Sequence, residues 1–319
     1  MRRFLLKLLA FLLILAAVDF GLGSAIGYFF KRTLYGENWS KENWLLSRPH
    51  DVVILGSSRA FRSYIPSIMQ DTLQLSVFNA GANGQYLLYA YALEQMVLET
   101  CKPRLILLDL LPNYVTQSEP LDQELGRMSA LAPYADYPQV RKLLTRGKPG
   151  EELKLCSRLY RYNSRLLSIA DNYFKDAAGM DNGFVFIGQT RFRDTNHFPD
   201  DLDANPRVPY DPYRIGILRE FVRSARDAGV AVVFCYSPAV TPTSAKIRQI
   251  LDFYRALADE LQVPFIEMTS ESYPEFQERA LFSDVIHMNE TGARQYTALF
   301  VRELRRVLEE NGWLREVPS

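Results

Sequence analysis

The sequence has no net charge and few cysteines or histidines. Its 319 residues carry 37 basic and 37 acidic side chains. No surplus of Lys and Arg is therefore available to neutralise phosphates, which argues against a nucleic-acid ligand. The three cysteines, Cys101, Cys156 and Cys235, show no metal-binding spacing, and at most one pair can form a disulfide. Cys235 lies in an apolar run, which predicts a buried thiol.

Internal repeats, heptad arrays and low-complexity tracts are also lacking, so a repeat or coiled-coil architecture is not expected. What the chain does contain is apolar material, since 48% of its residues are hydrophobic. This amount is ample for one sizeable core. We expect one large α/β domain rather than two.

The N-terminus begins with Arg2, Arg3 and Lys7, and Asp19 is then the only charged residue as far as Phe30. A signal peptide would use residues 8–18 as its apolar region and 23–25 as its cleavage site. A membrane anchor would use the whole stretch, which is long enough to cross a bilayer. The apolar residues continue past the cleavage site, so residues 1–32 are interpreted as an anchor. Either interpretation places the remainder outside the cytoplasm.

Asp19 would be costly in lipid and is expected to contact a polar group on a partner's transmembrane helix. Residues 33–50 form a polar connector with Trp39 and Trp44. These two rings either sit at the headgroup level or pack on the domain.

From residue 51 to 315 the chain alternates between strand and helix patterns, with one interruption. This order is typical of βαβ units around a parallel sheet, and it predicts a three-layer α/β/α sandwich of flavodoxin-like type. Strands are expected at 52–55, 76–79, 105–108, 230–236 and 263–267, and helices at 65–73, 86–100, 212–228, 243–261 and 290–310, the last with Asn289 as N-cap.

The interruption, at about 114–205, is interpreted as a helical insertion at the carboxyl side of the sheet, with residues 139–174 helical. Asp201, Asp203 and Asn205 resemble the start of a calcium loop, but Pro206 and Pro212 replace its required glycine and glutamate. We therefore expect no metal or other cofactor.

Aromatic and basic side chains of the insertion have two interpretations. They either offer flat faces and hydrogen bonds to sugar rings, or pack the insertion's own small core; they are Tyr134, Tyr137, Tyr160, Tyr162, Arg161 and Arg165.

A serine, a histidine and a carboxylate stand where nucleophilic chemistry would need them. The first strand stops at Gly56 and is followed by Ser57 and Ser58, at the edge where open α/β folds bind ligands. A serine nucleophile needs a base, and the base needs a third group to fix its tautomer. Of the three histidines, His287 has Asp284 three residues before it, in a loop that leads into a helix, and this spacing lets the carboxylate reach the imidazole. His50 precedes the first strand and His197 lies in the polar insertion.

Acyl chemistry also needs donors for the developing oxyanion. The other strand-end turns offer the backbone N–H of Gly84 and the side-chain amide of Asn113. Each has an ordinary alternative, a turn glycine for Gly84 and a helix cap for Asn113. Arg59, next to Ser58, is a further binding candidate.

These blocks resemble the SGNH (GDSL-type) hydrolases and acyltransferases. Residues 56–58 are similar to that family's Gly-Asp-Ser block, which maps the nucleophile to Ser58. Residues 79–84 match its Asn-x-Gly-x-x-Gly block, 111–114 resemble its third block, and 284–292 match its Asp-x-x-His block. Ser57 in place of the usual Asp, and Arg59 in place of an apolar residue, depart from the pattern.

With its N-terminal span, the chain looks like the membrane-anchored, extracytoplasmic branch of this family, similar to teichoic acid D-alanylation and alginate O-acetylation proteins. That resemblance implies an O-acyltransferase or esterase acting on a cell-envelope glycan or another acyl ester, beside a membrane-bound O-acyltransferase. The alternative is a non-catalytic binding or assembly module of an envelope polysaccharide system.

Overall fold

The computed structural model describes residues 1–34, 41–163, 165–174, 180–186, 188, 191–198 and 207–314. In place of the single domain expected, the chain forms two compact units. Unit 1 comprises residues 1–44 and 125–177, and unit 2 comprises 45–124 and 178–319, so that α2 (Lys41–Ser47) and α6 (Leu121–Arg127) cross the division. The insertion has therefore formed a core with the N-terminal segment.

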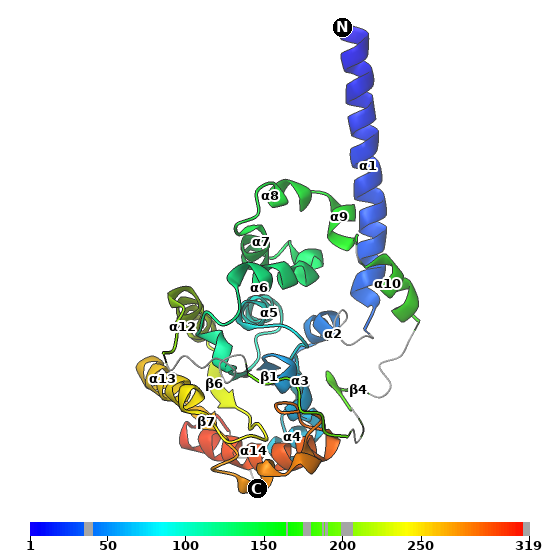
Figure 1. Ribbon diagram of the computed structural model, residues 1–319. Coiled ribbons are helices and arrows are strands. Elements are labelled where there is room, and N and C mark those ends of the chain that lie inside the picture. Colours follow the sequence, from blue (N-terminus) through cyan, green and yellow to red (C-terminus); the bar gives the residue numbers. More distant parts are fainter. Residues whose placement is uncertain are drawn as a thin grey trace. The chain divides into compact units, whose positions relative to one another are not determined.

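Unit 1 is helical and is built around the long helix α1 (Arg2–Arg32). The other described helices of unit 1 are short: η2 (Met128–Tyr134), α7 (Pro138–Thr145), α8 (Glu151–Lys154), α9 (Arg158–Tyr162) and α10 (Leu166–Asn172). Helices α9 and α10 lie beside the second half of α1 (Figure 1). The continuous helix expected at 139–174 is thus broken. A loop with Gly147, Pro149 and Gly150 separates α7 from α8, and the Ser157 side chain starts α9 by accepting a hydrogen bond from the Tyr160 N–H.

Asp19 contacts its own chain in this structure, not a partner's helix. Its carboxylate accepts hydrogen bonds from Ser157 Oγ at 2.5 Å, the Arg158 N–H at 2.9 Å and the Leu159 N–H at 3.1 Å. The polar contact expected on a partner's helix is made within the chain instead, because the first turn of α9 supplies N–H donors, which a carboxylate accepts well.

Two tyrosines of the insertion pack in the core of unit 1. The Tyr134 and Tyr162 rings are buried and lie 5.7 and 5.5 Å from the ring of Phe30 in α1. The Tyr134 hydroxyl donates to Asn43 Oδ1 at 2.8 Å, and Arg165 donates to the Ala130 carbonyl at 2.9 Å. These are the contacts of a small core.

Three smaller expectations concern the connector and the cysteines. Trp44 is buried and packs on protein, whereas Trp39 lies outside the described residues. The three cysteines are free thiols, and Cys235 is buried as predicted.

Unit 2 is an α/β fold around a five-stranded parallel sheet in the order β2-β1-β3-β6-β7. The expected alternation is confirmed, and its elements are β1 (Val52–Leu55), α3 (Ser58–Ser63), α4 (Pro66–Leu73), β2 (Val77–Asn79), α5 (Leu87–Thr100), β3 (Leu105–Asp109), η1 (Pro112–Tyr114), the hairpin β4 (Met180–Asp181) and β5 (Phe184–Val185), α12 (Pro212–Asp227), β6 (Ala231–Tyr236), α13 (Ala245–Leu261), β7 (Phe265–Glu267), η3 (Pro274–Gln277), η4 (Arg279–Leu281) and α14 (Glu290–Glu310).

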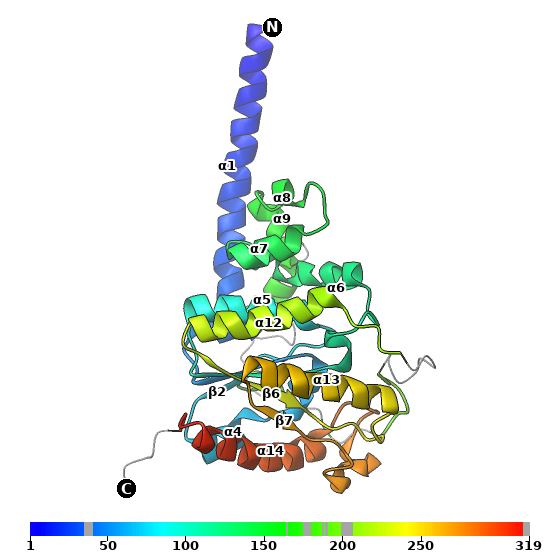
Figure 2. The ribbon, with the colours of Figure 1, turned by 90° about the vertical axis from the view of Figure 1, so that its left-hand side faces the viewer.

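Strands β1, β2 and β3 are buried along their whole length, which explains why their sequences are apolar runs rather than alternating patterns. Helix α5 runs beside α12, and α14 packs on α3 and α4 (Figure 2). Because all strands are parallel, their carboxyl ends lie at one edge. The strand order reverses between β1 and β3, the point at which doubly wound sheets bind ligands.

Candidate active site

Ser58 lies at this reversal point, at the carboxyl end of β1. Gly56 takes φ = +151°, and a Cβ there would come within 2.8 Å of the Ala60 Cβ and 3.1 Å of the Asp109 carbonyl oxygen. Ser57 caps α3, its Oγ accepting a hydrogen bond from the Arg59 N–H at 3.2 Å. Ser58 is therefore the first residue of a helix that can only start so close to the sheet because position 56 has no side chain.

The second glycine-containing turn holds α3 from the side of β2. Asn79 is buried, and its Nδ2 donates to the carbonyls of Ala60 and Tyr64 at 2.8 Å each. Its Oδ1 accepts from the Gly81 N–H at 2.9 Å. A Cβ on Gly81 would lie 2.4 Å from the Phe61 nitrogen, so the turn and the helix are in direct backbone contact.

His287 and Asp284 meet Ser58 in a single hydrogen-bonded chain. His287 Nε2 lies 2.7 Å from Ser58 Oγ, and His287 Nδ1 lies 2.9 Å from each oxygen of Asp284. Both His287 and Asp284 are buried. A proton on Nδ1 that is shared with the carboxylate leaves the Nε2 lone pair facing the serine hydroxyl, which is the tautomer a general base requires.

Asp284 is held in place by further donors. The N–H groups of Ile286 and His287 donate to its Oδ1 at 3.1 and 3.0 Å, and Asn196 Nδ2 donates to its Oδ2 at 2.7 Å. Burial alone would raise the pKa of Asp284, but the hydrogen bonds from His287 and Asn196 outweigh it, and the pKa is lowered. The carboxylate therefore stays charged beside the imidazole.

The loop that carries His287 is fixed at the start of α14. Asn289 caps this helix as predicted, its Oδ1 accepting from the Gly292 N–H at 3.1 Å, while its Nδ2 donates to the Ala280 carbonyl at 2.6 Å. The Ser283 N–H donates to the His287 carbonyl at 2.8 Å. The base is thus supported on both sides by short backbone links.

The two oxyanion candidates lie at the ends of the strands that flank β1. Gly84, with φ = +66°, belongs to the turn after β2, and Asn113 lies in η1 directly after β3. Asn113 is 7% exposed, and its Oδ1 has no hydrogen-bond partner among the described residues. Its side-chain oxygen is thus not used in the helix cap considered above.

Arg59 is fully buried beside the nucleophile. Its guanidinium lies over the Tyr236 ring at 4.4 Å and the Phe198 ring at 5.1 Å. None of its three side-chain nitrogens has a hydrogen-bond partner in the described part of the chain. A buried cation whose donors are all unused is unusual, because each unmet donor costs free energy.

Asp109, at the end of β3, is a buried acid that interacts electrostatically with Arg59. It accepts hydrogen bonds from the Tyr64 hydroxyl at 2.8 Å and from the Ser237 N–H and hydroxyl at 3.2 and 3.4 Å. Burial raises the pKa of Asp109, and the charge of Arg59 works against that rise. In the sequence Asp109 directly follows the expected strand 105–108, but no pattern there indicates its hydrogen-bond partners.

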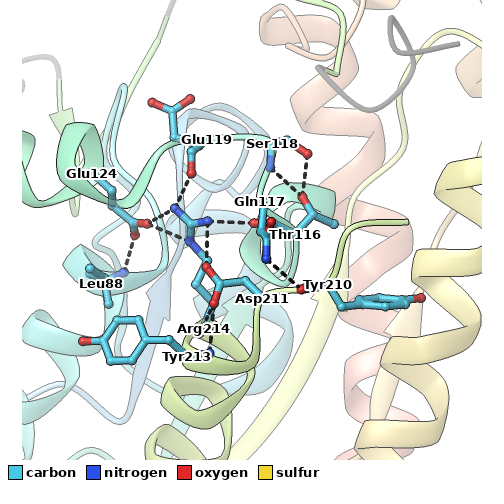
Figure 3. A network of polar contacts seen from close by, with 10 residues as sticks. All are labelled: Leu88, Thr116, Gln117, Ser118, Glu119, Glu124, Tyr210, Asp211, Tyr213 and Arg214. Atoms are coloured by element: carbon cyan, nitrogen blue, oxygen red, sulfur yellow. Dashed lines mark hydrogen bonds and ion pairs between the residues drawn. The ribbon is translucent and has the colours of Figure 1, made fainter. Parts of the chain in front are cut away.

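A second buried arginine ties down the chain that follows Asn113 (Figure 3). Arg214 of α12 donates through Nε and Nη2 to Glu124 Oε2 at 3.0 and 2.9 Å, and to the carbonyls of Thr116 and Glu119 at 2.7 and 2.6 Å. The other oxygen of Glu124 accepts from the Leu88 N–H at the start of α5 at 2.8 Å. The segment after β3 is thereby fixed to two helices.

The remaining histidines lie elsewhere. His50 is buried against the Phe78 ring at 4.8 Å, before β1 and so at the opposite edge of the sheet, and His197 pairs with Asp194 at 3.2 Å. Within the described ranges no three His, Cys, Asp or Glu side chains form a group that could hold a metal ion. Asp201, Asp203 and Asn205 lie outside those ranges.

Asn196 is the residue of this site that the sequence did not reveal. It comes from the polar insertion, 88 residues before Asp284, and it belongs to no motif.

Comparison of the chain with models of known protein families gave no match, and comparison with curated proteins gave none either.

Proposed function

We propose that this chain is a membrane-anchored serine acyl-transfer enzyme of SGNH type, with Ser58 as nucleophile, His287 as general base and Asp284 as the group that orients His287. The observation that carries this proposal is the continuous chain of hydrogen bonds from Asp284 through His287 to Ser58 Oγ, at 2.9 and 2.7 Å. The three residues are 229 positions apart at the widest, and each meets a partner of the type its role requires.

In the first half-reaction, Ser58 Oγ attacks the acyl carbonyl carbon while its proton passes to His287 Nε2. The imidazolium returns that proton to the leaving alcohol as the carbon–oxygen bond breaks, leaving the acyl group on Ser58. In the second half-reaction, water or a sugar hydroxyl gives its proton to His287 and attacks the acyl-enzyme, which restores the serine. Hydrolysis and transfer therefore share one intermediate.

Charge develops on the carbonyl oxygen in both half-reactions. The N–H groups of Ser58 and Gly84 and the side-chain amide of Asn113 are the proposed donors to it, since β1 lies between the strands that deliver the other two. One such donor typically contributes about 3–4 kcal/mol to the lowering of the barrier. Arg59 supplies further donors to the bound substrate.

The wider setting follows the resemblance set out above. The strand order supports a three-layer α/β/α arrangement, and α1 is long and apolar enough to span a membrane. We propose that α1 anchors the protein with unit 2 outside the cytoplasm, that the substrate is a cell-envelope glycan or another acyl ester, and that a membrane-bound O-acyltransferase is the partner. A gene for such a partner beside this one would favour transfer over hydrolysis.

Labelling with a fluorophosphonate probe, read by intact-mass spectrometry, tests the assignment. We expect one adduct on the full-length protein, none on Ser58→Ala, and labelling slowed by more than about a hundredfold in His287→Ala. Ser57→Ala is the matched control, because it removes the neighbouring hydroxyl and a helix cap worth about 1 kcal/mol but leaves the nucleophile.

Labelling that survives Ser58→Ala, or that is unaffected by His287→Ala, would overturn the assignment. A folded wild-type protein that takes no label would favour the non-catalytic binding module instead.

A further inference from the structure

Exposed apolar side chains are concentrated in unit 1. Outside residues 1–34, the large hydrophobic side chains that are exposed among the described residues are Leu153, Leu166, Leu167 and Phe174. All four belong to unit 1, and Leu167 and Phe174 are 87% and 89% exposed. Unit 2 has a far larger core, yet none of its described large hydrophobic side chains is exposed to this degree. The apolar surface is therefore a property of one unit.

An apolar groove runs between α10 and the end of α1. It has a volume of about 260 Å³ and is lined by Ile26 and Phe29 of α1 and by Leu166, Ile169, Tyr173 and Phe174. Leu167, which follows Leu166 on the same short helix, is exposed. The groove and the exposed side chains thus form one apolar surface that includes part of α1 itself.

The first residue of α1 that the rest of unit 1 covers is Asp19. Residues 1–18 are all exposed, whereas Asp19 is bonded to the first turn of α9, and Gly23 and Gly27 lie under that helix. A Cβ on Gly23 would be 2.4 Å from the Arg158 Cβ, and one on Gly27 would be 2.7 Å from the Tyr162 hydroxyl. Helices α9 and α10 are therefore fixed against the second half of α1 (Figure 1).

The length of α1 sets the level at which α9 and α10 meet the membrane. The uncovered part, residues 2–18, is only about 25 Å long at 1.5 Å per residue, less than the roughly 30 Å of a hydrocarbon core. All 31 residues of α1 span about 46 Å, close to the thickness of a bilayer with both headgroup layers. An α1 that crosses the membrane therefore has the first few residues of its covered half at the edge of the hydrocarbon core and the rest in the headgroup layer.

The side chains at that level suit this layer. Tyr28 and Phe29 lie near the end of α1, with the Arg32 guanidinium over the Tyr28 ring at 3.6 Å, and Tyr173 packs on Phe29 at 5.2 Å. Aromatic rings with flanking basic residues are typical of membrane interfaces. Residues 125–177 carry ten basic and five acidic side chains, a surplus that favours anionic headgroups.

We propose that unit 1 is a membrane-interface module. Leu166, Leu167 and Phe174 enter the leaflet from which α1 emerges, and the groove between α1 and α10 takes up a lipid acyl chain. The proposal rests on the anchoring role of α1 given above but is independent of the chemistry at Ser58. Asp19 then lies within about 5 Å of the edge of the hydrocarbon core and not at its middle, and the donors of α9 satisfy its carboxylate there.

Depth measurement by fluorescence quenching tests the proposal. Leu167→Cys, in a Cys101→Ser, Cys156→Ser background, is labelled with an environment-sensitive dye on the full-length protein in phosphatidylcholine–phosphatidylglycerol vesicles. Leu167 is so exposed that the substitution removes almost no packing. We expect lipids with a nitroxide near the headgroup to quench this dye at least about twofold, compared with the same vesicles without nitroxide.

A second position separates the anchor from the interface module. A dye at Leu12→Cys, in the uncovered part of α1, should be quenched best by nitroxides deep in the acyl chains. Deep quenching at Leu12 with no quenching at Leu167 by nitroxides at either depth would overturn the interface module while leaving the anchor intact. No quenching at Leu12 would reject the anchor, and the module with it.

Discussion

Unit 2 buries two arginines at the carboxyl side of its sheet, and the two differ in whether their guanidinium groups donate hydrogen bonds. Arg214 is 1% exposed, and its guanidinium donates to Glu124 and to the carbonyls of Thr116 and Glu119. Arg59 is 0% exposed and donates to nothing in the described part of the chain. A buried charge whose donors are all used organises the fold. One whose donors are free, beside a candidate nucleophile, is better explained by something that binds there.

Removing Arg214 is expected to have the largest effect on stability. Arg214→Met leaves the Glu124 carboxylate buried without its cation, and the free energy of unfolding should fall by about 3–5 kcal/mol. Denaturant unfolding followed by circular dichroism measures this. Arg219→Met, on the same helix, is the matched control, because its pair with Glu260 is exposed and should be worth about 0–1 kcal/mol.

The double variant Arg214→Met, Glu124→Leu should recover much of the loss, since the most deeply buried carboxylate is then removed. Asp211, the other carboxylate that Arg214 contacts, is partly exposed and keeps its hydrogen bond from the Tyr213 N–H. A double variant as unstable as the single one would show that Arg214 acts through its carbonyl bonds rather than through Glu124.

Glu94 is a third buried ionisable residue to compare with these arginines: a carboxyl whose hydrogen-bond partners in the described part of the chain are neutral. Its partners are Gln95 and the Ser224 hydroxyl, at 3.0 and 2.8 Å, and burial raises its pKa to about 8. The native state therefore keeps a proton that the unfolded state releases near pH 4.5. The stabilisation is complete below pH 4.5 and is lost as the pH rises toward 8, with a fall of about 2–3 kcal/mol between pH 5 and 7.

Glu94→Gln should remove this slope, so that the variant gains on the wild type as the pH rises. Unfolding free energies at several pH values measure it. Equal slopes in the two proteins would show that Glu94 ionises in the native state near its ordinary pKa.

Removing Arg59 is expected to have the smallest effect on stability, within about 1 kcal/mol, because Arg59→Met strands no hydrogen-bond partner. Activity should respond instead. Turnover of a small ester should fall about 10- to 100-fold, since a hydrogen bond from a charged donor contributes about 1.5–3 kcal/mol. If Arg59→Met destabilises the protein as much as Arg214→Met but leaves turnover unchanged, the contrast between the two arginines is false.

The sequence predicted unit 2 better than unit 1. Val52 to Leu55 and the other apolar runs report burial directly, and Gly56 and Asn289 mark a turn and a cap by local chemistry, so the strand order and the approach of His287 to Ser58 were within reach. Asn196 was not, because nothing local distinguishes it from other polar loop residues. Whether it meets Asp284 depends on how a patternless segment folds back over 88 residues.

Unit 1 was missed for a related reason. The pattern of α1 is that of any apolar span, and nothing in it predicts that Gly23 and Gly27 accommodate α9 from residues 158–162. From the sequence, Asp19 is a carboxylate in an apolar helix with no donor nearby. Its donors, the N–H groups of Arg158 and Leu159, are backbone atoms that no sequence pattern displays.

The contact between Asp19 and Ser157 also fixes an order of events during synthesis. The two residues are 138 positions apart, and the chain between them contains the first three strands of the sheet. At roughly 5–20 residues per second, Asp19 is made about 7–28 s before the residues that satisfy its carboxylate. Unit 1 can therefore close only after residues 45–124, about a third of the other unit, have been made.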